Sequence, residues 1–356
     1  AAFGLLAYQS QWLRRHHPAE FLCALLNAQP MGFYPPATLV RDAQRRGVEV
    51  LAPDVNVSAA QCAIEAASGG RRAPSYNLSQ GDSPATRADS RCTTVSLGTV
   101  SAVRIGISYV TSVGEDEAEA LVVERGERGP FRDIGDLARR VQLSRDGLEA
   151  LVKGGACDGF GRKRRDLLWE LGLVLRPQSV PGTNGEAKQL PLSLDPTAET
   201  PELRDLTRWE RMLADYRHTG LSVGTHPLGL LRQHLPSGTL SSAELVEHPH
   251  GRQVAVAGMA IARQRPSTAN GIVFMLLEDE FGQVNLIVPA TVYERHRAIV
   301  RGEPLVLARG RYEKIGENRN VLVSELESLG RLAHKVAESD AVWESLPRAH
   351  HFGQGR

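Results

Sequence analysis

The stretch "GGACDGFGRKRRDLLWEL" (residues 154–171) combines three features in 18 residues. Four of its first eight residues are glycines, four consecutive cations follow, and the rest is an apolar, helix-like run. Glycine at a bend lets backbone N–H groups face outward, and a helix start adds N–H groups without intrahelical partners at the positive end of the helix dipole. The stretch therefore predicts a loop that binds a nucleic-acid phosphate through main-chain amides.

A second unit of the same kind lies upstream, in "ISYVTSVGEDEAEALVVERG" (residues 107–126). A short apolar segment leads to a turn at 111–114, and a helix begins at Glu115. The alternative interpretation is that the glycines only cap helices and the cations form a solvated run. Because the upstream helix begins with three acidic residues, which repel phosphate, we expect that unit to be mainly structural. The predicted DNA-binding residues of the pair are Val113, Gly114, Gly154, Gly155, Arg162, Lys163, Arg164 and Arg165.

From about residue 251 the hydrophobic period changes to two, as in β-strands. The segments "QVAVAGMAIARQ", "GIVFMLLEDEFGQVNLIV", "PLVLARGRYEKIG" and "NVLVSELESL" predict five strands, and "TVYERHRAIV" predicts a short helix between the third and fourth. This is the layout of an OB-type barrel, a fold that often binds single-stranded nucleic acid. The alternative is that these polar positions simply face solvent. The predicted DNA-binding residues of the barrel are Arg263, Arg265, Phe274, Arg309, Tyr312 and Lys314.

The remaining chain divides by composition. The segment at 66–94 is rich in Gly, Ser, Pro and Arg, so it buries too little surface to offset its ordering entropy and we expect a mobile insertion. The sequence thus predicts an α+β multidomain chain. Its expected parts are small helical elements at 1–60, the insertion at 66–94, a tandem helix–hairpin–helix module at 96–175, a linker at 176–202, a helical connector at 203–250, the barrel at 251–330 and a tail at 331–356.

The bulk composition narrows the class of protein. The formal net charge is +1, so attraction to a polyanion has to come from local patches. None of the four cysteines belongs to a C-x-x-C pair, which argues against a zinc ribbon and a disulfide framework and favours a reducing compartment.

We find neither a membrane-spanning apolar run nor a signal peptide, so we expect a cytoplasmic chain with no membrane partner. Because the first residues already resemble the middle of a domain, we also expect a fragment.

Two further motifs have alternative interpretations. The acidic triplet of "LLEDEFG", Glu278 to Glu280, resembles a set of metal-binding carboxylates, but its place between two strands favours a hairpin turn. The segment "QLPLSL" (residues 189–194) is either a short docking peptide or plain linker. The competing functional hypotheses are a non-catalytic adaptor that binds nucleic acid or protein and, more remotely, a small hydrolase that uses the acidic triplet.

Several long segments resemble one family. The segment "AYQSQWLRRHHPAEFLCALLNAQPMGFY" (7–34) resembles the fingers region of bacterial C-family DNA polymerases, and with "RRGVEVLAPDVNVS" (45–58) it resembles their error-prone branch. "VRIGISYVTSVGEDEAEALV" and "LEALVKGGACDGFG" are similar to the tandem helix–hairpin–helix module of that branch. "LADYRHTGLSVGTHPLGLLR" and the strand segments above are similar to the approach to its OB domain and to that domain itself.

The resemblance implies part of a template-directed polymerase for damage-induced mutagenesis and translesion synthesis. The palm carboxylates that hold Mg²⁺ are expected before Ala1, so this chain would bind DNA, catalyse nothing and need no cofactor of its own. The implied partners are primer-template DNA and, through 176–202 or the C-terminal region, a sliding clamp or mutagenesis accessory proteins. Three departures from the family stand out: Ser112 replaces a glycine, "QLPLSL" lacks the aromatic end of a clamp peptide, and the long insertion at 66–94 is expected to separate two strands of a hairpin.

Overall fold

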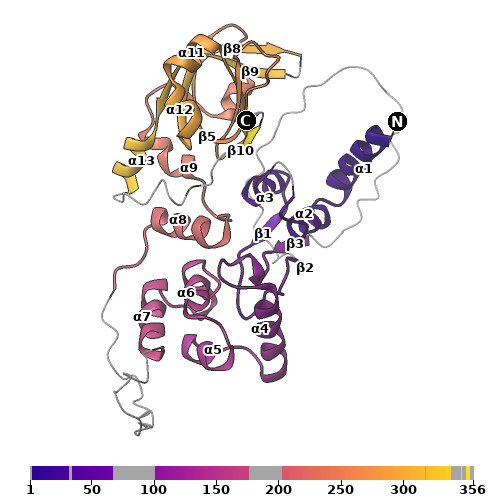
Figure 1. Ribbon diagram of the computed structural model, residues 1–356, viewed down its shortest axis with the longest axis vertical. Helices are drawn as coiled ribbons and strands as arrows, with labels where there is room; N and C mark the ends of the chain where they lie inside the picture. Colours follow the sequence, from indigo (N-terminus) through magenta and orange to yellow (C-terminus); the bar gives the residue numbers. More distant parts are fainter. Residues whose placement is uncertain are drawn as a thin grey trace.

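The computed structural model describes residues 2–31, 34–66, 101–175, 203–316, 318–337, 346 and 350–352. Except for Ala66, the expected insertion at 66–94 lies outside these residues, and so does the whole expected linker at 176–202. Figure 1 shows the helical elements of the first half of the chain below and beside the C-terminal barrel.

The chain begins with helices and a small sheet. Proline occupies the first turn of the second and third helices, where its missing N–H leaves no helical bond unmade. The helices are α1 (Ala2–His16), α2 (Pro18–Asn27) and α3 (Pro36–Arg45), and the strands are β1 (Glu49–Leu51), β2 (Ala63–Ala66) and β3 (Ser101–Arg104). Strands β2 and β3 pair antiparallel, with Ala66 opposite Ser101, so the expectation that the insertion separates two hairpin strands is confirmed.

The two predicted helix–bend–helix units are present. Their core is fully apolar, and Leu121, Leu137 and Leu151 are each 0% exposed. Side chains cap two of the helices: Asp133 accepts from Asp136 N, and Ser144 accepts from Gly147 N. The elements are η1 (Ile107–Tyr109), α4 (Glu115–Arg128), α5 (Ile134–Arg140), α6 (Arg145–Lys153), η2 (Asp158–Phe160) and α7 (Arg164–Val174).

The connector is helical, as predicted, and it contains a break after its main helix. A capping box of Thr207 and Glu210 starts its main helix, and Gly220, in the left-handed conformation at φ 72°, ends it. The elements are α8 (Arg208–Thr219), α9 (Pro227–Leu231), η3 (Arg232–His234), β4 (Thr239–Leu240) and α10 (Ser242–Val246).

The C-terminal strands form a closed barrel of the predicted OB type. Strands β5 (Gln253–Gln264), β6 (Val273–Glu278) and β7 (Gln283–Val288) form a meander, and β9 (Asn318–Ser328) pairs parallel to β7 and antiparallel to β8 (Leu305–Ile315). The pairing of β8 with β5 closes the barrel. The predicted helix between the third and fourth strands is present as two short ones. The other elements are α11 (Ala290–Arg295), α12 (Arg297–Gly302), α13 (Gly330–Ala337) and β10 (His350–Phe352), which pairs with β5.

In the part of the chain that the structure describes, buried apolar residues form three clusters. One fills the barrel and another the helix–hairpin–helix elements. The third joins α2, α3, α8, α9 and α13 to the outer wall of the barrel through Met259, Ile261, Leu305 and Leu307. The connector therefore packs simultaneously on the N-terminal helices and on the barrel. Among the described helices, none has the length and apolar character needed to cross a bilayer.

Candidate nucleic-acid interface

The bend after α6 does not present its amides to solvent. Gly154 N donates to Ala150 O at 2.7 Å, Gly155 N to Val152 O at 3.2 Å, and Ala156 N to Leu151 O at 2.9 Å. The last two bonds, together with φ +86° at Gly155, define a Schellman helix cap. Both glycines are buried. The predicted outward orientation of the Gly154 and Gly155 amides was therefore wrong, because the helix end uses them itself.

Arg164 is a structural residue. Its side chain is only 6% exposed, and it contacts Asp158, Lys153 O and Asp215, with 2.8 Å from Nη1 to Asp215 Oδ1. Burial opposes the positive charge, but hydrogen bonds and ion pairs to the two aspartates outweigh it and raise the pKa of the guanidinium. The prediction that Arg164 flanks a phosphate was wrong because the side chain faces inward.

The other three cations of the run also have partners within the chain. Arg165 Nη2 lies 2.7 Å from Glu210 Oε1, Lys163 Nζ donates to Leu203 O at 3.0 Å, and Arg162 pairs with Glu170. The Arg162 side chain is 43% exposed, and an exposed pair of this kind contributes little to stability. Arg162 is therefore the most exposed cation of the run.

The main-chain donors available for a phosphate lie at the start of α7. Leu167 N donates to Lys163 O, so the three preceding amides have no acceptor within the helix. Gly161, at φ +70° and exposed, turns the chain into this helix. The predicted combination of glycine, helix start and cation thus exists at 161–166, seven residues beyond the predicted bend.

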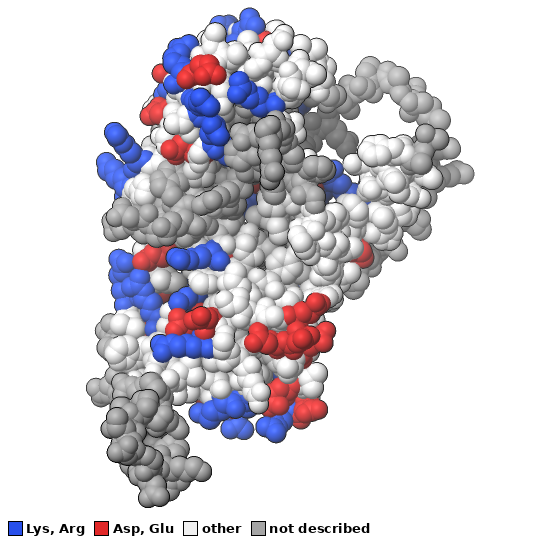
Figure 2. Space-filling model, in the orientation of Figure 1, with Lys and Arg blue, Asp and Glu red and all other residues white. Residues whose placement is uncertain are grey.

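The first bend is also occupied. Val113 is 6% exposed and its amide donates to Val110 O, while Gly114 N donates to Glu117 Oε2 at 2.8 Å. Ser112 adopts φ 62°, the left-handed region for which glycine is better suited. Figure 2 shows Asp and Glu gathered over α4, whereas Lys and Arg, interspersed with acids, follow the side of α7 and α8. Val113 and Gly114 therefore do not offer the predicted phosphate contact.

Helix α8 packs against both bends, a relationship without any local sequence signal. His218 O accepts from Thr111 N at 2.7 Å. A Cβ at Gly154 would lie 3.3 Å from His218 Cβ and 3.2 Å from Thr219 Cγ2, so a side chain at the second bend would crowd α8. Burial, followed by the cations Lys153, Arg217 and Arg164, lowers the pKa of His218 to about 4.

Two predicted barrel residues face inward. Arg263 is 5% exposed and donates to Glu303 O, and burial lowers its pKa to about 10. Tyr312 is 0% exposed and packs in the barrel interior. The prediction that these two residues reach nucleic acid was wrong: their positions in the strand point to the core.

Four predicted barrel residues do reach the surface. Phe274 is 39% exposed, and the guanidinium of Arg265 lies 4.4 Å from the centroid of Tyr293. Arg309 is 39% exposed and 3.4 Å from Glu325 and Glu327, and Lys314 is exposed with Nζ 3.2 Å from Val246 O. Since Phe274 is registered opposite Gln264, it lies near Arg265 at one end of the barrel.

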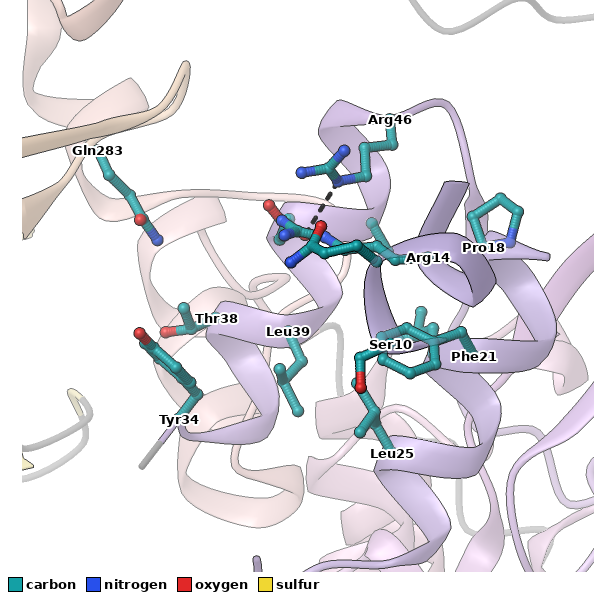
Figure 3. A pocket seen from close by; sticks show the side chains of 14 residues that line it. Ser10, Arg14, Pro18, Phe21, Leu25, Tyr34, Thr38, Leu39, Arg46 and Gln283 are labelled. Atoms are coloured by element: carbon teal, nitrogen blue, oxygen red, sulfur yellow. Dashed lines mark hydrogen bonds and ion pairs between the residues drawn. The ribbon is translucent and has the colours of Figure 1, made fainter. Parts of the chain in front are cut away.

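A cavity of about 380 Å³ lies apart from these residues, between α1, α2 and α3 (Figure 3). Phe21, Leu25 and Leu39 line its apolar part. At its rim, Arg14 and Arg46 both bind Asp42, at 2.7 and 3.1 Å. No predicted DNA-binding residue lines this cavity.

Comparisons with known proteins agree with the fold. The family described as "Helix-hairpin-helix motif" matches residues 47–167. The chain is 40% identical over 330 residues to an error-prone DNA polymerase of Anaeromyxobacter sp. (strain K), a match that covers 92% of the chain and 26% of that protein. The error-prone DNA polymerase of Methylococcus capsulatus is 40% identical over 335 residues, covering 93% and 30%, and that of Mycolicibacterium paratuberculosis is 37% identical over 338 residues, covering 94% and 27%. The chain thus spans between a quarter and a third of the length of these relatives.

Proposed function

Because the chain is related over 92% of its length to a part of bacterial error-prone DNA polymerases, we propose that it is a DNA-binding part of such a polymerase. The helix–hairpin–helix elements bind duplex product, and the barrel guides the single-stranded template. The main support for this proposal is the 40% sequence identity to these polymerases. The aligned 330 residues include both the helix–hairpin–helix elements and the barrel.

The start of α7 is the proposed duplex contact. Its unused amides and the positive end of the helix dipole attract an anion irrespective of base sequence. Arg162 adds an exposed cation on the same loop. Contacts of this kind set affinity and register rather than sequence preference, as a polymerase requires of a site behind its active centre.

The proposed single-strand contact is the barrel end that carries Arg265 and Phe274. The strands β6 and β7 and the loop after β5 belong to the surface that OB barrels use for oligonucleotides. Phe274 offers a ring on which a base can stack, and Arg265 and Lys314 offer cations for the backbone.

The activity of the whole polymerase is also part of the proposal. We assign it to damage-induced mutagenesis and translesion synthesis, with nucleotidyl transfer by Mg²⁺-binding carboxylates of a palm region outside this chain. The acidic triplet of the barrel does not substitute for them, because arginine and serine side chains already bind its carboxylates. A sliding clamp and mutagenesis accessory proteins stay predicted partners, and the linker at 176–202 that would bind them lies outside the described residues.

The test is DNA binding measured by fluorescence anisotropy as a function of salt. We expect the wild-type chain to bind both a duplex and a single strand. Arg162→Gln should reduce the slope of log affinity against log salt for the duplex by about 0.9, the contribution of one neutralised phosphate. The fragment should extend no primer in the presence of Mg²⁺ and nucleotides.

The matched control is Arg128→Gln, which removes an exposed, ion-paired cation from the acidic helix α4. This variant should keep the wild-type slope. A chain that binds neither form of DNA, although circular dichroism shows it folded, contradicts the proposal. An equal slope in wild type and Arg162→Gln refutes the contact at α7 alone.

A further inference from the structure

The acidic hairpin, Glu278–Gly282, joins β6 to β7 and stabilises its own turn. Asp279 N donates to Gly282 O at 2.9 Å, and Asp279 Oδ1 accepts from Phe281 N and Gly282 N at 2.9 and 2.8 Å. The same carboxylate also accepts from Ser242 N and Oγ at the start of α10. The hairpin is therefore rigid, and its two other carboxylates project from a fixed base.

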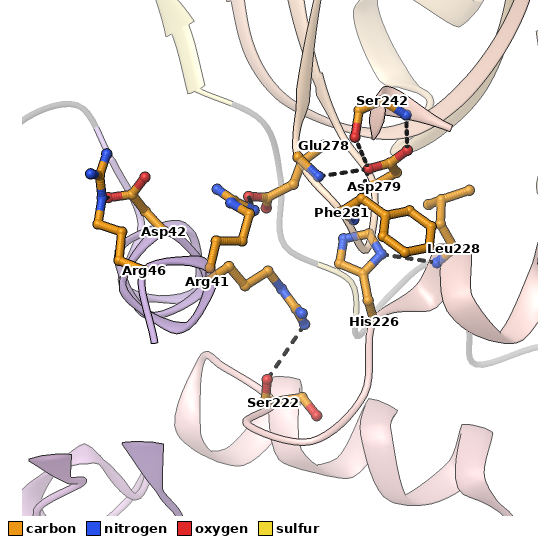
Figure 4. A network of polar contacts seen from close by, with 12 residues as sticks. Arg41, Asp42, Arg46, Ser222, His226, Leu228, Ser242, Glu278, Asp279 and Phe281 are labelled. Carbon is orange, nitrogen blue, oxygen red and sulfur yellow. Dashed lines mark hydrogen bonds and ion pairs between the residues drawn. The ribbon is translucent and has the colours of Figure 1, made fainter. Parts of the chain in front are cut away.

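These two carboxylates bind arginines from two different helical elements. Glu278 Oε1 lies 3.0 Å from Arg45 Nη1 on α3, and Glu278 is 0% exposed. Glu280 binds Arg232 of η3 in a bidentate manner, at 2.7 and 2.8 Å. The hairpin thus connects the barrel to the N-terminal helices and to the connector (Figure 4).

The surface that receives the hairpin is itself tied together. Arg41 Nη2 donates to Tyr216 Oη at 2.8 Å and to Thr225 O at 2.9 Å, which joins α3 to α8 and to the loop before α9. His226, fully buried, accepts from Leu228 N at 3.1 Å and holds the start of α9. The two arginines that meet the hairpin therefore come from one preformed body.

The polar character of this junction indicates a role in orientation. Glu278 Oε2, Arg41 Nε, Arg232 Nη1 and His226 Nε2 are buried without a hydrogen-bond partner among the described residues. Burial raises the pKa of Glu278, against the effect of Arg45 and Arg41. Well-packed apolar residues would stabilise such a contact more effectively, whereas paired charges tolerate few alternative orientations. Apolar packing thus attaches the barrel to the N-terminal helices and the connector, and the ion pairs select one orientation of the barrel relative to them.

We propose that the acidic hairpin positions the barrel: its ion pairs with Arg45 and Arg232 hold the barrel at one angle to the helix–hairpin–helix elements, so that both bind one DNA molecule simultaneously. The second half of this statement rests on the proposed function, and the first does not. Glu278 and Glu280 are thus positioning residues. They contact no DNA and act through the orientation of Phe274 and its neighbours.

The experiment measures the orientation directly and without DNA. Spin labels at Val123→Cys and Ile315→Cys, whose parent side chains are 57% and 68% exposed, report the distance between α4 and the barrel. The three described native cysteines are buried, and Cys92, which lies outside the described residues, is replaced with serine, so that these two positions take the labels. Wild type should give one narrow distance distribution. Arg232→Gln and Glu280→Gln should broaden it at least twofold.

The control is Arg232→Lys, which keeps a cation beside both Glu280 and Asp279. It should broaden the distribution less than Arg232→Gln does. Arg128→Gln, which removes an exposed charge elsewhere, should leave the distribution unchanged. A distribution that stays narrow in both single variants overturns the positioning role.

DNA binding then tests the second half of the proposal. For a primer-template long enough to reach both parts, Arg232→Gln should weaken binding about tenfold, and Arg232→Lys should weaken it less. A duplex or single strand that is too short to reach both the helix–hairpin–helix elements and the barrel should bind Arg232→Gln and wild type equally well. The variant changes only the effective concentration of the second binding part for a DNA already bound to the first. If the distribution broadens but long and short DNA lose affinity equally, simultaneous binding is refuted. If no DNA binds at all, the proposed function fails while the positioning role stands.

Discussion

Arg164 and Asp215 form an ion pair with 2.8 Å between Nη1 and Oδ1, although 51 positions separate them in the chain. Arg164 begins α7, and Asp215 lies in the middle of α8, beyond the expected linker. Because Arg164 binds Asp215, the centre of the basic run joins α7 to α8 and is not available for DNA. It also explains why Gly155 is glycine, since a Cβ there would collide with the guanidinium.

Replacing Arg164 with glutamine should strongly destabilise the chain. The change leaves the Asp215 carboxylate, 21% exposed, without its cation, so we expect a loss of about 3 kcal/mol in the free energy of unfolding. Urea titration followed by circular dichroism measures it. Arg145→Gln, which breaks an exposed i,i+4 pair, should cost at most about 0.5 kcal/mol. Equal losses in the two variants would contradict the structural role of Arg164.

Gly155→Ala should cost more stability than Gly161→Ala. Both positions have a left-handed backbone, at φ +86° and +70°, which costs an alanine about 1–2 kcal/mol. At Gly155 the added methyl group also meets Arg164, whereas at Gly161 nothing lies within 4 Å. The difference in midpoint of thermal or urea unfolding measures this effect. Indistinguishable midpoints would show that Arg164 is free to move away.

Stability should fall between pH 6.5 and about 4, in part because of His218. The folded chain holds the pKa of this ring at about 4, against an ordinary value near 6.5, so in this window the unfolded chain binds a proton that the folded chain does not. Burial lowers the pKa of His226 as well, and this acts in the same direction. The slope of unfolding free energy against pH reports how many more protons the unfolded chain binds than the folded chain. His218→Gln should reduce this difference by up to about one proton, and His226 should account for part of the remaining slope.

The measurement for His218 is urea unfolding at half-unit pH steps from 4 to 7. Superimposable slopes for wild type and His218→Gln would mean that the ring titrates normally in the folded chain. A slope of opposite sign would mean that protonation stabilises the contact between His218 and Thr111, whose Oγ1 lies 3.3 Å from Nδ1.

Phe274→Ala should weaken single-strand binding without affecting duplex binding. Stacking of a base on an aromatic ring contributes about 1–3 kcal/mol, which corresponds to a loss of affinity of about 5-fold to 150-fold. Anisotropy with a labelled oligothymidylate measures it. Val123→Ala, an exposed apolar truncation on α4, serves as the control and should bind as wild type. Equal affinity of wild type and Phe274→Ala would remove Phe274 from the interface.

Much of the fold could be predicted from local patterns. Alternation with a period of two marked the strands of the barrel, and the turn at 111–114 marked the start of the helix at Glu115. Such signals act over a few residues, so they can be recognised without the tertiary structure. The resemblance of long segments to one polymerase family, carried by the residue order alone, is confirmed by the relatives.

The candidate site could be predicted only in part. The glycine-rich segment does lead into a helix start with a free end, but at Gly161 rather than Gly154, because both elements contain glycine and only hydrogen-bond geometry tells a helix cap from an open loop. In the barrel, Arg263 and Phe274 were both plausible contacts. Strand pairing turned the first inward and the second outward.

The sequence by itself determined most of the helices and strands and the likeness to error-prone polymerases, because period and residue order can be read along the chain. Only the tertiary structure decided which charges are free. Arg164 and Arg165 meet Asp215 and Glu210, and Glu278 meets Arg45, across 45 to 233 positions of chain. An ion pair depends on a separation of a few ångströms in space, and no local pattern in the sequence records that distance.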